Sequence, residues 1–112
     1  MPLARATVVT ATIPNGQSLS DAADVGLGQI LGLNVPTITA AALTFQGSDD
    51  GVVFKNLKDA AGNEVQIASS TGNAFVAAPA ALGGVAFLKI RSGTSGVPVN
   101  QGGDRIVAVV IK

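Results

Sequence analysis

Short runs of Val, Ile, Thr and Ala, separated by turns that contain Gly or Pro, limit what this chain can fold into. The sequence holds 14 Gly and 5 Pro in 112 residues, so few stretches are long enough for a stable helix. β-Branched residues favour strands, and Gly and Pro interrupt regular structure. We therefore predict an all-β fold, an antiparallel β-sandwich with a single domain over residues 1–112, in which residues 1–5 form a flexible N-terminal arm.

The segment LTFQGSDDGVVFKNL, residues 43–57, carries the strongest local signal. An Asp-Gly pair, Asp50-Gly51, lies between two apolar runs. Gly accepts the positive φ that a tight turn requires, and Asp tolerates it. We predict a β-hairpin whose arms are residues 43–47 and 52–57.

Other runs predict further strands at residues 6–13, 28–36, 64–68, 74–76, 85–91 and 105–112. Pro14-Asn15-Gly16 forms the turn after the first strand, and Pro36 is expected to end the second. Ser20 is a candidate cap for a single helical turn. Residues 69–73 are predicted as a polar loop, residues 78–84 as a loop or a short helix, and residues 92–104 as a long Gly-rich loop.

In the C-terminal run RIVAVVIK, apolar residues would lie on both faces of a strand. Ile106, Ala108 and Val110 share one face, and Val107, Val109 and Ile111 share the other. A strand with one wet face would alternate, so this pattern predicts that both faces are covered. The cover is either loops over a central strand or a contact between subunits.

The high hydrophobic content and low charge of the chain limit the classes of partner that we expect. Hydrophobic residues make up 47% of the chain and charged residues only 12%, about half the usual share. The apolar surplus predicts surface that is buried against other copies or a larger assembly. Seven basic and seven acidic residues cancel, which argues against nucleic acid and anionic membranes as partners.

Reactive side chains are scarce, because the chain has no Cys and no His. That removes disulfides, thiolate metal sites and the commonest general base. Asp49 and Asp50 are adjacent in a predicted turn, where Asp is favoured for backbone reasons. We predict no enzyme activity, no cofactor and no metal. The longest apolar stretch, residues 74–88, is too short to span a membrane, and the N-terminus lacks the pattern of a secretory signal.

A candidate interaction site surrounds the loop at residues 92–104. Arg91 and Arg105 bracket this loop, and either they border a binding mouth or they form ordinary surface ion pairs. Phe87, on the polar face of its strand, is either an interface anchor or a core residue. The candidate interaction residues are Phe87, Lys89, Arg91, Ser92, Thr94, Asn100, Gln101 and Arg105.

Two segments resemble discoidin-type, galactose-binding-like jelly rolls. Phe45, Ser48, Asp50, Gly51 and Phe54 match a strand, a Ser-x-Asp-Gly turn and an aromatic residue on the return strand. Residues 87–90, FLKI, match a later strand of those domains. From Ala42 onward the chain resembles more closely a group of small proteins encoded among the virion genes of tailed bacteriophages, and RSGT…PVNQGGDR is its most specific part.

The resemblance implies a jelly-roll-like β-sandwich that serves as a structural virion protein. The expected role is a capsid decoration or cement protein on the outside of the head, made in the cytoplasm of the bacterial host. Its expected partners are the major capsid protein or other virion proteins, and other copies of itself, with a trimer favoured. The alternative is a carbohydrate- or receptor-binding module of a head spike, tail or fibre.

Overall fold

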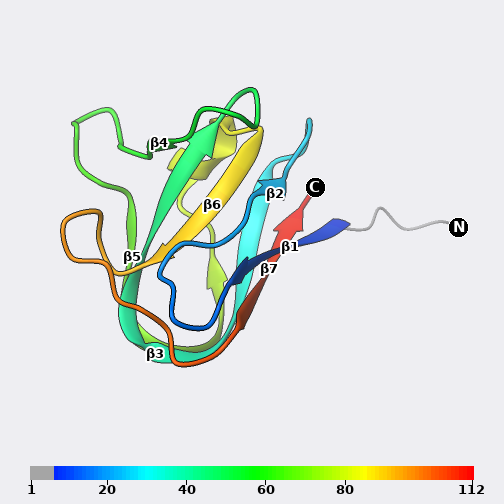
Figure 1. Ribbon diagram of the computed structural model, residues 1–112. Helices are drawn as coiled ribbons and strands as arrows, with labels where there is room; N and C mark the ends of the chain where they lie inside the picture. The colour runs from blue at the N-terminus through cyan, green and yellow to red at the C-terminus, as the bar shows by residue number, and fades with distance from the viewer. Residues whose placement is uncertain (1–6) are drawn as a thin grey trace, which may run out of the picture.

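The computed structural model describes residues 7–112, which form one antiparallel sheet of seven strands (Figure 1). The prediction of an all-β chain is confirmed, and the expected arm at residues 1–5 lies outside the described residues. The elements are β1 (Thr7–Ile13), β2 (Ala23–Asp24), β3 (Ile30–Ser48), β4 (Lys55–Asn56), β5 (Gln66–Ala77), the 3₁₀ turn η1 (Ala80–Gly84), β6 (Phe87–Ser92) and β7 (Arg105–Ile111).

The strand order is β1-β7-β3-β6-β2, and β4 and β5 pair with the other edge of β3. The sheet curls through 282° into a nearly closed barrel. Its two ends, β1 and β2, approach each other where the main-chain N–H of Asp21 donates to the carbonyl of Thr12 at 3.1 Å. None of the helical turns among residues 7–112 is long and apolar enough to cross a membrane.

β3 is the central strand, and it continues through Pro36 instead of ending there as predicted. β7 pairs with β3 only as far as Asn34, and β6 only from Leu43 onward. Neither of these strands therefore lies beside Pro36, and the register between β3 and β5 passes from Val35↔Ala74 to Thr37↔Gly72 without a pair at Pro36. Proline has no N–H to donate, and it occupies a position of β3 that belongs to no strand pair.

Two other local predictions were wrong. Ser20 caps no helix: its buried hydroxyl accepts a hydrogen bond from the Ile90 N–H at 2.8 Å and donates to the Asp21 carbonyl. The predicted polar loop at residues 69–73 is instead part of β5, which is continuous from Gln66 to Ala77 and pairs with β3 with register shifts. Ser, Thr and Asn are tolerated there because most of β5 is exposed.

The hairpin after β3 is confirmed, but its return arm is short. Only Lys55 and Asn56 pair with β3, opposite Gly47 and Gln46. The residues before them are held by the Asp50 carboxylate, which accepts hydrogen bonds from the N–H groups of Val52 and Val53. Gly51 has a φ of +78°, as the turn prediction requires.

The core fills the interior of the curled sheet. β7 contributes Val107, Val109 and Ile111 to it, while Ile106 is 58% exposed and Val110 is half-buried. The prediction that both faces of this strand are covered is therefore wrong for the single chain. The largest fully buried side chains are Phe45, Ile13, Leu33, Leu82, Leu88, Ile90, Gln101, Val107, Val109, Thr44 and Ser92.

Candidate functional site

The outward face of β6 carries Phe87 and Lys89, and the segment after β3 lies over both. An added Cβ on Gly51 would lie 3.1 Å from the Phe87 ring, so the turn packs directly on that ring. The Lys89 ammonium lies 4.5 Å from the centre of the Phe54 ring, which is a cation–π distance. Both candidate residues are thus half-covered by their own chain and offer only part of their surface to a partner.

Arg91, on the same face, is only 8% exposed. Its guanidinium donates to the Asn56 side-chain oxygen at 2.9 Å and to the Thr44 hydroxyl at 3.4 Å. It also lies 3.6 Å from the Glu64 carboxylate. Arg91 therefore ties β6 to β3, to β4 and to the segment before β5, and it does not border an open binding mouth.

Gln101 is buried, and its side chain makes the hydrogen bonds to β3 that a neighbouring strand would otherwise make. Its side-chain amide accepts from the Thr39 N–H at 2.8 Å and donates to the Thr39 carbonyl at 3.2 Å. Thr39 lies on the edge of β3 between the stretches that pair with β7 and β6. Arg105 donates to the Gln101 oxygen at 3.1 Å. Arg91 and Arg105 thus belong to two separate hydrogen-bonded groups, and Arg105 forms no ion pair within residues 7–112.

The remaining candidates differ in exposure. Ser92 is buried, and its hydroxyl donates to the Val99 carbonyl. Thr94 closes a tight turn by accepting from the Val97 N–H at 3.0 Å. Asn100 is exposed. The structure therefore does not bring the eight candidates into one site. Among those in the loop, Asn100 is exposed to solvent and Thr94 is partly exposed.

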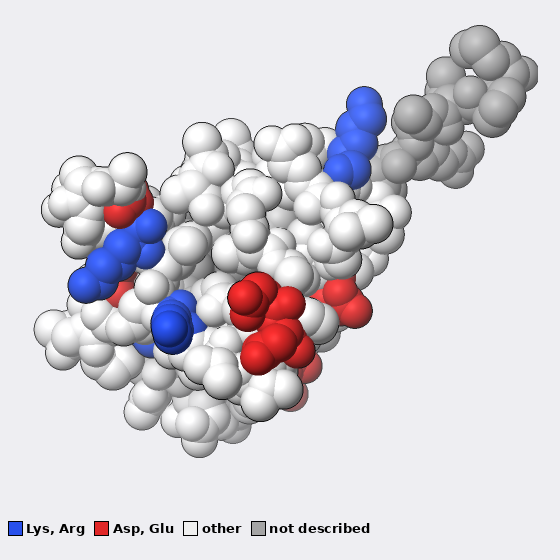
Figure 2. Space-filling view, turned by 90° about the horizontal axis from the view of Figure 1, so that it is seen from above, with Lys and Arg blue, Asp and Glu red and all other residues white. Residues whose placement is uncertain are grey.

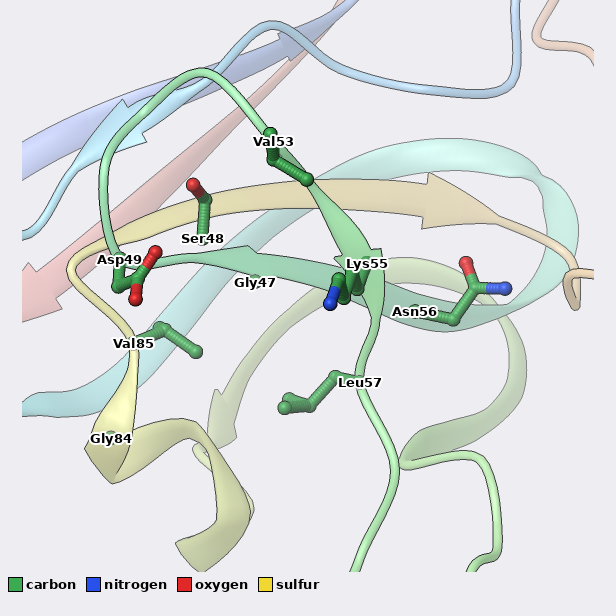
Figure 3. A pocket seen from close by; sticks show the side chains of 9 residues that line it. All are labelled: Gly47, Ser48, Asp49, Val53, Lys55, Asn56, Leu57, Gly84 and Val85. Carbon is green, nitrogen blue, oxygen red and sulfur yellow. The ribbon is translucent and has the colours of Figure 1, made fainter.

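A shallow pocket of about 420 Å³ lies between β4 and the end of η1 (Figure 3). The side chains of Leu57 and Val85 point toward one another below Gly47, which has no side chain to fill the space. Its lining residues are Gly47, Ser48, Asp49, Val53, Lys55, Asn56, Leu57, Gly84 and Val85. Apolar side chains, an acidic residue (Asp49) and a basic residue (Lys55) all line this pocket.

A second feature is an uncharged sheet face on the outside of β1, β7, β3 and β5, which we call the outer face. The register aligns Val8 with Val110 and Gly32, and aligns Thr10 with Ala108, Asn34 and Phe75. The Phe75 ring lies over Gly32, where an added Cβ would be 2.7 Å from it. The outer face consists of Val8, Thr10, Thr12, Gly32, Asn34, Phe75, Ile106, Ala108 and Val110.

Large apolar groups on the outer face are open to solvent. Phe75 is 67% exposed and Val8 57%, and Ile106 shares this face. Single exposed apolar residues are ordinary, but a group of them on one uncharged sheet face is typical of an interaction surface. Figure 2 shows Lys, Arg, Asp and Glu as a few separate groups on a largely uncharged surface.

The chemistry available to the described residues is limited. Acidic side chains of residues 7–112 do not gather in groups that could hold a metal ion. Every buried side-chain N or O in that range has a hydrogen-bond partner, so no buried polar group there awaits a ligand.

The sequence pointed to β7 but not to the outer face as a whole. The apolar pattern of residues 105–112 predicted that both faces of β7 are covered, and Ile106 is instead exposed on the outer face. Phe75 was placed in a predicted strand without a function, because its neighbours on β3 and β7 are distant in sequence. The pocket had no local signal at all, since it forms where Gly47 meets Val85.

Compared with known proteins, the chain matches no family model, and no curated protein or solved structure shows significant similarity to it.

Proposed function

We propose that this protein is a structural virion protein of a tailed bacteriophage, a capsid decoration or cement protein that stabilises the assembled head. The observation that carries the proposal is the outer face, where Val8, Phe75 and Ile106 are exposed on an uncharged sheet. The resemblance of residues 42–112 to small virion proteins supports it. The partners would be the major capsid protein and further copies of the chain, grouped as trimers on the capsid surface after synthesis in the host cytoplasm.

The mechanism is thermodynamic. A protein that binds only the assembled shell stabilises it by about 2.7 kcal/mol per site when its free concentration is one hundred times its dissociation constant. Several weak contacts within a trimer act together and raise retention without any strong single contact. This role needs no catalytic group, cofactor, metal, nucleic acid or membrane.

The finer architecture, a jelly-roll-like β-sandwich, is also part of this proposal. The long strand β3 pairs with β7 in its first part and with β6 in its second. The two parts of the curled sheet thereby enclose one core, as the two sheets of a sandwich do.

Binding to heads tests the role. Purified protein is added to assembled heads that lack it, and co-sedimentation and the temperature of head disruption are measured. We expect binding and a higher disruption temperature. Ile106→Lys should weaken binding, because it places a charge on the outer face. Val97→Lys, which also replaces an exposed β-branched residue by Lys but in the loop before β7, should not. Failure of the parent protein to bind heads would refute the role.

If both variants bind as the parent does, the outer face is not the contact. The role would then depend on another surface, and the exposed tips of the loops become the next candidates.

The pocket favours a second candidate function, a carbohydrate- or receptor-binding module of a head spike, tail or fibre. Asp49, Lys55 and the amide nitrogen of Asn56 offer hydrogen-bonding groups around an apolar floor, a combination that small-ligand sites use. A glycan array with no hits, together with binding to heads, would favour decoration. Glycan binding that Lys55→Ala abolishes would favour this alternative.

A further inference from the structure

We infer that two copies of this protein associate through the free edge of β1, in an antiparallel pairing centred on Val9. β1 is the first strand in the sheet order and pairs only with β7. An edge strand presents main-chain donors and acceptors to any strand that can lie beside it. This inference does not depend on the virion role, and it concerns a contact between copies.

The hydrogen bonds of Thr12 define which residues of β1 face outward. The Thr12 N–H donates to the Asp21 carboxylate at 2.8 Å, and its carbonyl accepts from the Asp21 N–H. Both groups of Thr12 therefore point away from β7. Main-chain groups alternate along an antiparallel strand, so those of Thr10 and Val8 point the same way. Neither residue has another hydrogen-bond partner on that side within residues 7–112.

Nothing in β1 protects this edge. Natural edge strands are commonly blocked by Lys, Pro or a bulge. The sequence TVVTATI has none of these, and its pairing with β7 is regular from Thr7 to Ile13. Figure 1 shows the first part of β1 extending away from β2. Asp21, just before β2, occupies the edge at Thr12.

These limits select one register. A symmetric pairing centred on Val9 places Val8 of each copy opposite Thr10 of the other, and each such pair exchanges two hydrogen bonds. A pairing centred on Thr10 would require Thr12, which Asp21 already occupies. A pairing centred on Val8 would place Thr10 opposite residue 6, which lies outside the described residues. The register centred on Val9 is the one that pairs the two free residues, Val8 and Thr10, with each other.

Side chains and charges support a second copy as the occupant. In this register the β-branched side chains of Val8 and Thr10 lie across from each other, a favourable cross-strand combination. Antiparallel pairing also brings the Thr12 end of one copy, with Asp21, to the Thr7 end of the other. Lys112 follows Ile111, the partner of Thr7, so opposite charges meet at both ends of the contact. The two outer faces then become continuous, and a two-fold contact of this kind can link trimers.

Cysteine cross-linking tests the register. Because the chain has no native Cys, any disulfide must form through the introduced residue. In the proposed dimer, the two copies of Val9 form a non-hydrogen-bonded pair with Cα atoms about 4.5 Å apart, within the range for a disulfide. Val9→Cys should therefore form a disulfide-linked dimer under mild oxidation at about 1 mM protein, where a millimolar dissociation constant still gives a large dimer fraction.

Two further cysteine variants serve as matched controls. Val8→Cys alone should cross-link poorly, because its two copies lie on a diagonal about 7–8 Å apart. A mixture of Val8→Cys and Thr10→Cys proteins should form the mixed dimer. Equal cross-linking of Val8→Cys and Val9→Cys would overturn the register. No cross-linking of Val9→Cys, with only monomer in sedimentation at the same concentration, would overturn the pairing.

Substitutions without cysteine test the edge itself. Thr10→Pro removes a donor that faces away from β7, so the fold should persist while the association constant falls roughly tenfold or more, since each copy loses one hydrogen bond. Val8→Lys should have a similar effect, and Ile106→Lys, on the same face but within the sheet, should leave association within about twofold of the parent. If Ile106→Lys abolishes association and Thr10→Pro does not, the contact is the outer face and not the edge. These measurements use no heads, so they are separate from the test of the virion role.

Discussion

The Arg91 guanidinium lies 3.6 Å from the Glu64 carboxylate, and both side chains are largely buried. Glu64 also accepts a hydrogen bond from the N–H of Ser95 at 3.2 Å. The pair thus joins the end of β6 to the segment before β5 and to the loop before β7. A residue that the sequence suggested for binding a partner instead holds three parts of the chain together.

Arg91→Met should destabilise the fold by about 2–4 kcal/mol, because it leaves Glu64 largely buried without its counter-charge. Lys89→Met is the matched control on the same strand. It loses only a contact with the Phe54 ring, worth about 0.5–1 kcal/mol at a partly exposed site. Urea denaturation of both variants measures the difference. Equal losses would show that the Arg91 network contributes no more than a surface contact.

Gln101→Ala should cost about 1–3 kcal/mol, because the N–H and carbonyl of Thr39 lose their partner at a gap in the sheet. Asn100→Ala, at the exposed neighbouring residue, should change stability by no more than about 0.5 kcal/mol. Thermal melts of the two variants make the comparison. A loop shortened to remove Gln101 should be destabilised as well, and an unchanged melting temperature would contradict this account of the loop.

Gly51→Val should destabilise the fold by roughly 1 kcal/mol or more, since Gly51 has a φ of +78° and packs against the Phe87 ring. Gly96→Ala provides the control, because an added Cβ there meets no atom within 4 Å and the backbone is not left-handed. Chemical denaturation should separate the two variants clearly. A Gly51→Val protein as stable as the parent would mean that the turn has relaxed into another conformation.

Local features of the fold could be predicted, because their causes lie within a few residues. The turn at Asp50-Gly51 forms from its own side-chain and main-chain groups. The alternation of Leu88 and Ile90 with Phe87 and Lys89 follows from the period of a strand. These signals do not depend on what surrounds them.

Long-range features could not be predicted in the same way. Ser20 resembles a helix cap until Ile90, 70 residues later, donates to its hydroxyl. Pro36 is compatible with a strand because no residue of β5, β6 or β7 is paired with it. Gln101 and Arg91 are polar residues in or beside a Gly-rich loop, and only their partners on β3 and near β4 show that they are buried. The outer face likewise exists only once four strands are aligned.

Asp50 should give the turn after β3 a dependence on acid. Hydrogen bonds from the N–H groups of Val52 and Val53, and from the Ser48 hydroxyl, lower the pKa of Asp50 below its ordinary value of 3.8. A lowered pKa means that folding favours the charged carboxylate. Its contribution to stability is therefore complete above pH 3.8 and is lost as the pH falls through the lower, folded-state value.

Between neutral pH and about pH 5, this carboxylate should leave the melting temperature unchanged. Below that range the parent protein should lose stability faster than Asp50→Asn, which is neutral throughout and has no proton to take up. Asp49→Asn, the same change at the adjacent residue, should follow the parent curve, because the hydrogen bonds that hold the loop converge on Asp50. Melting curves of the three proteins over this range provide the measurement. If the parent and Asp50→Asn curves are parallel down to about pH 2, the Asp50 carboxylate does not hold the turn.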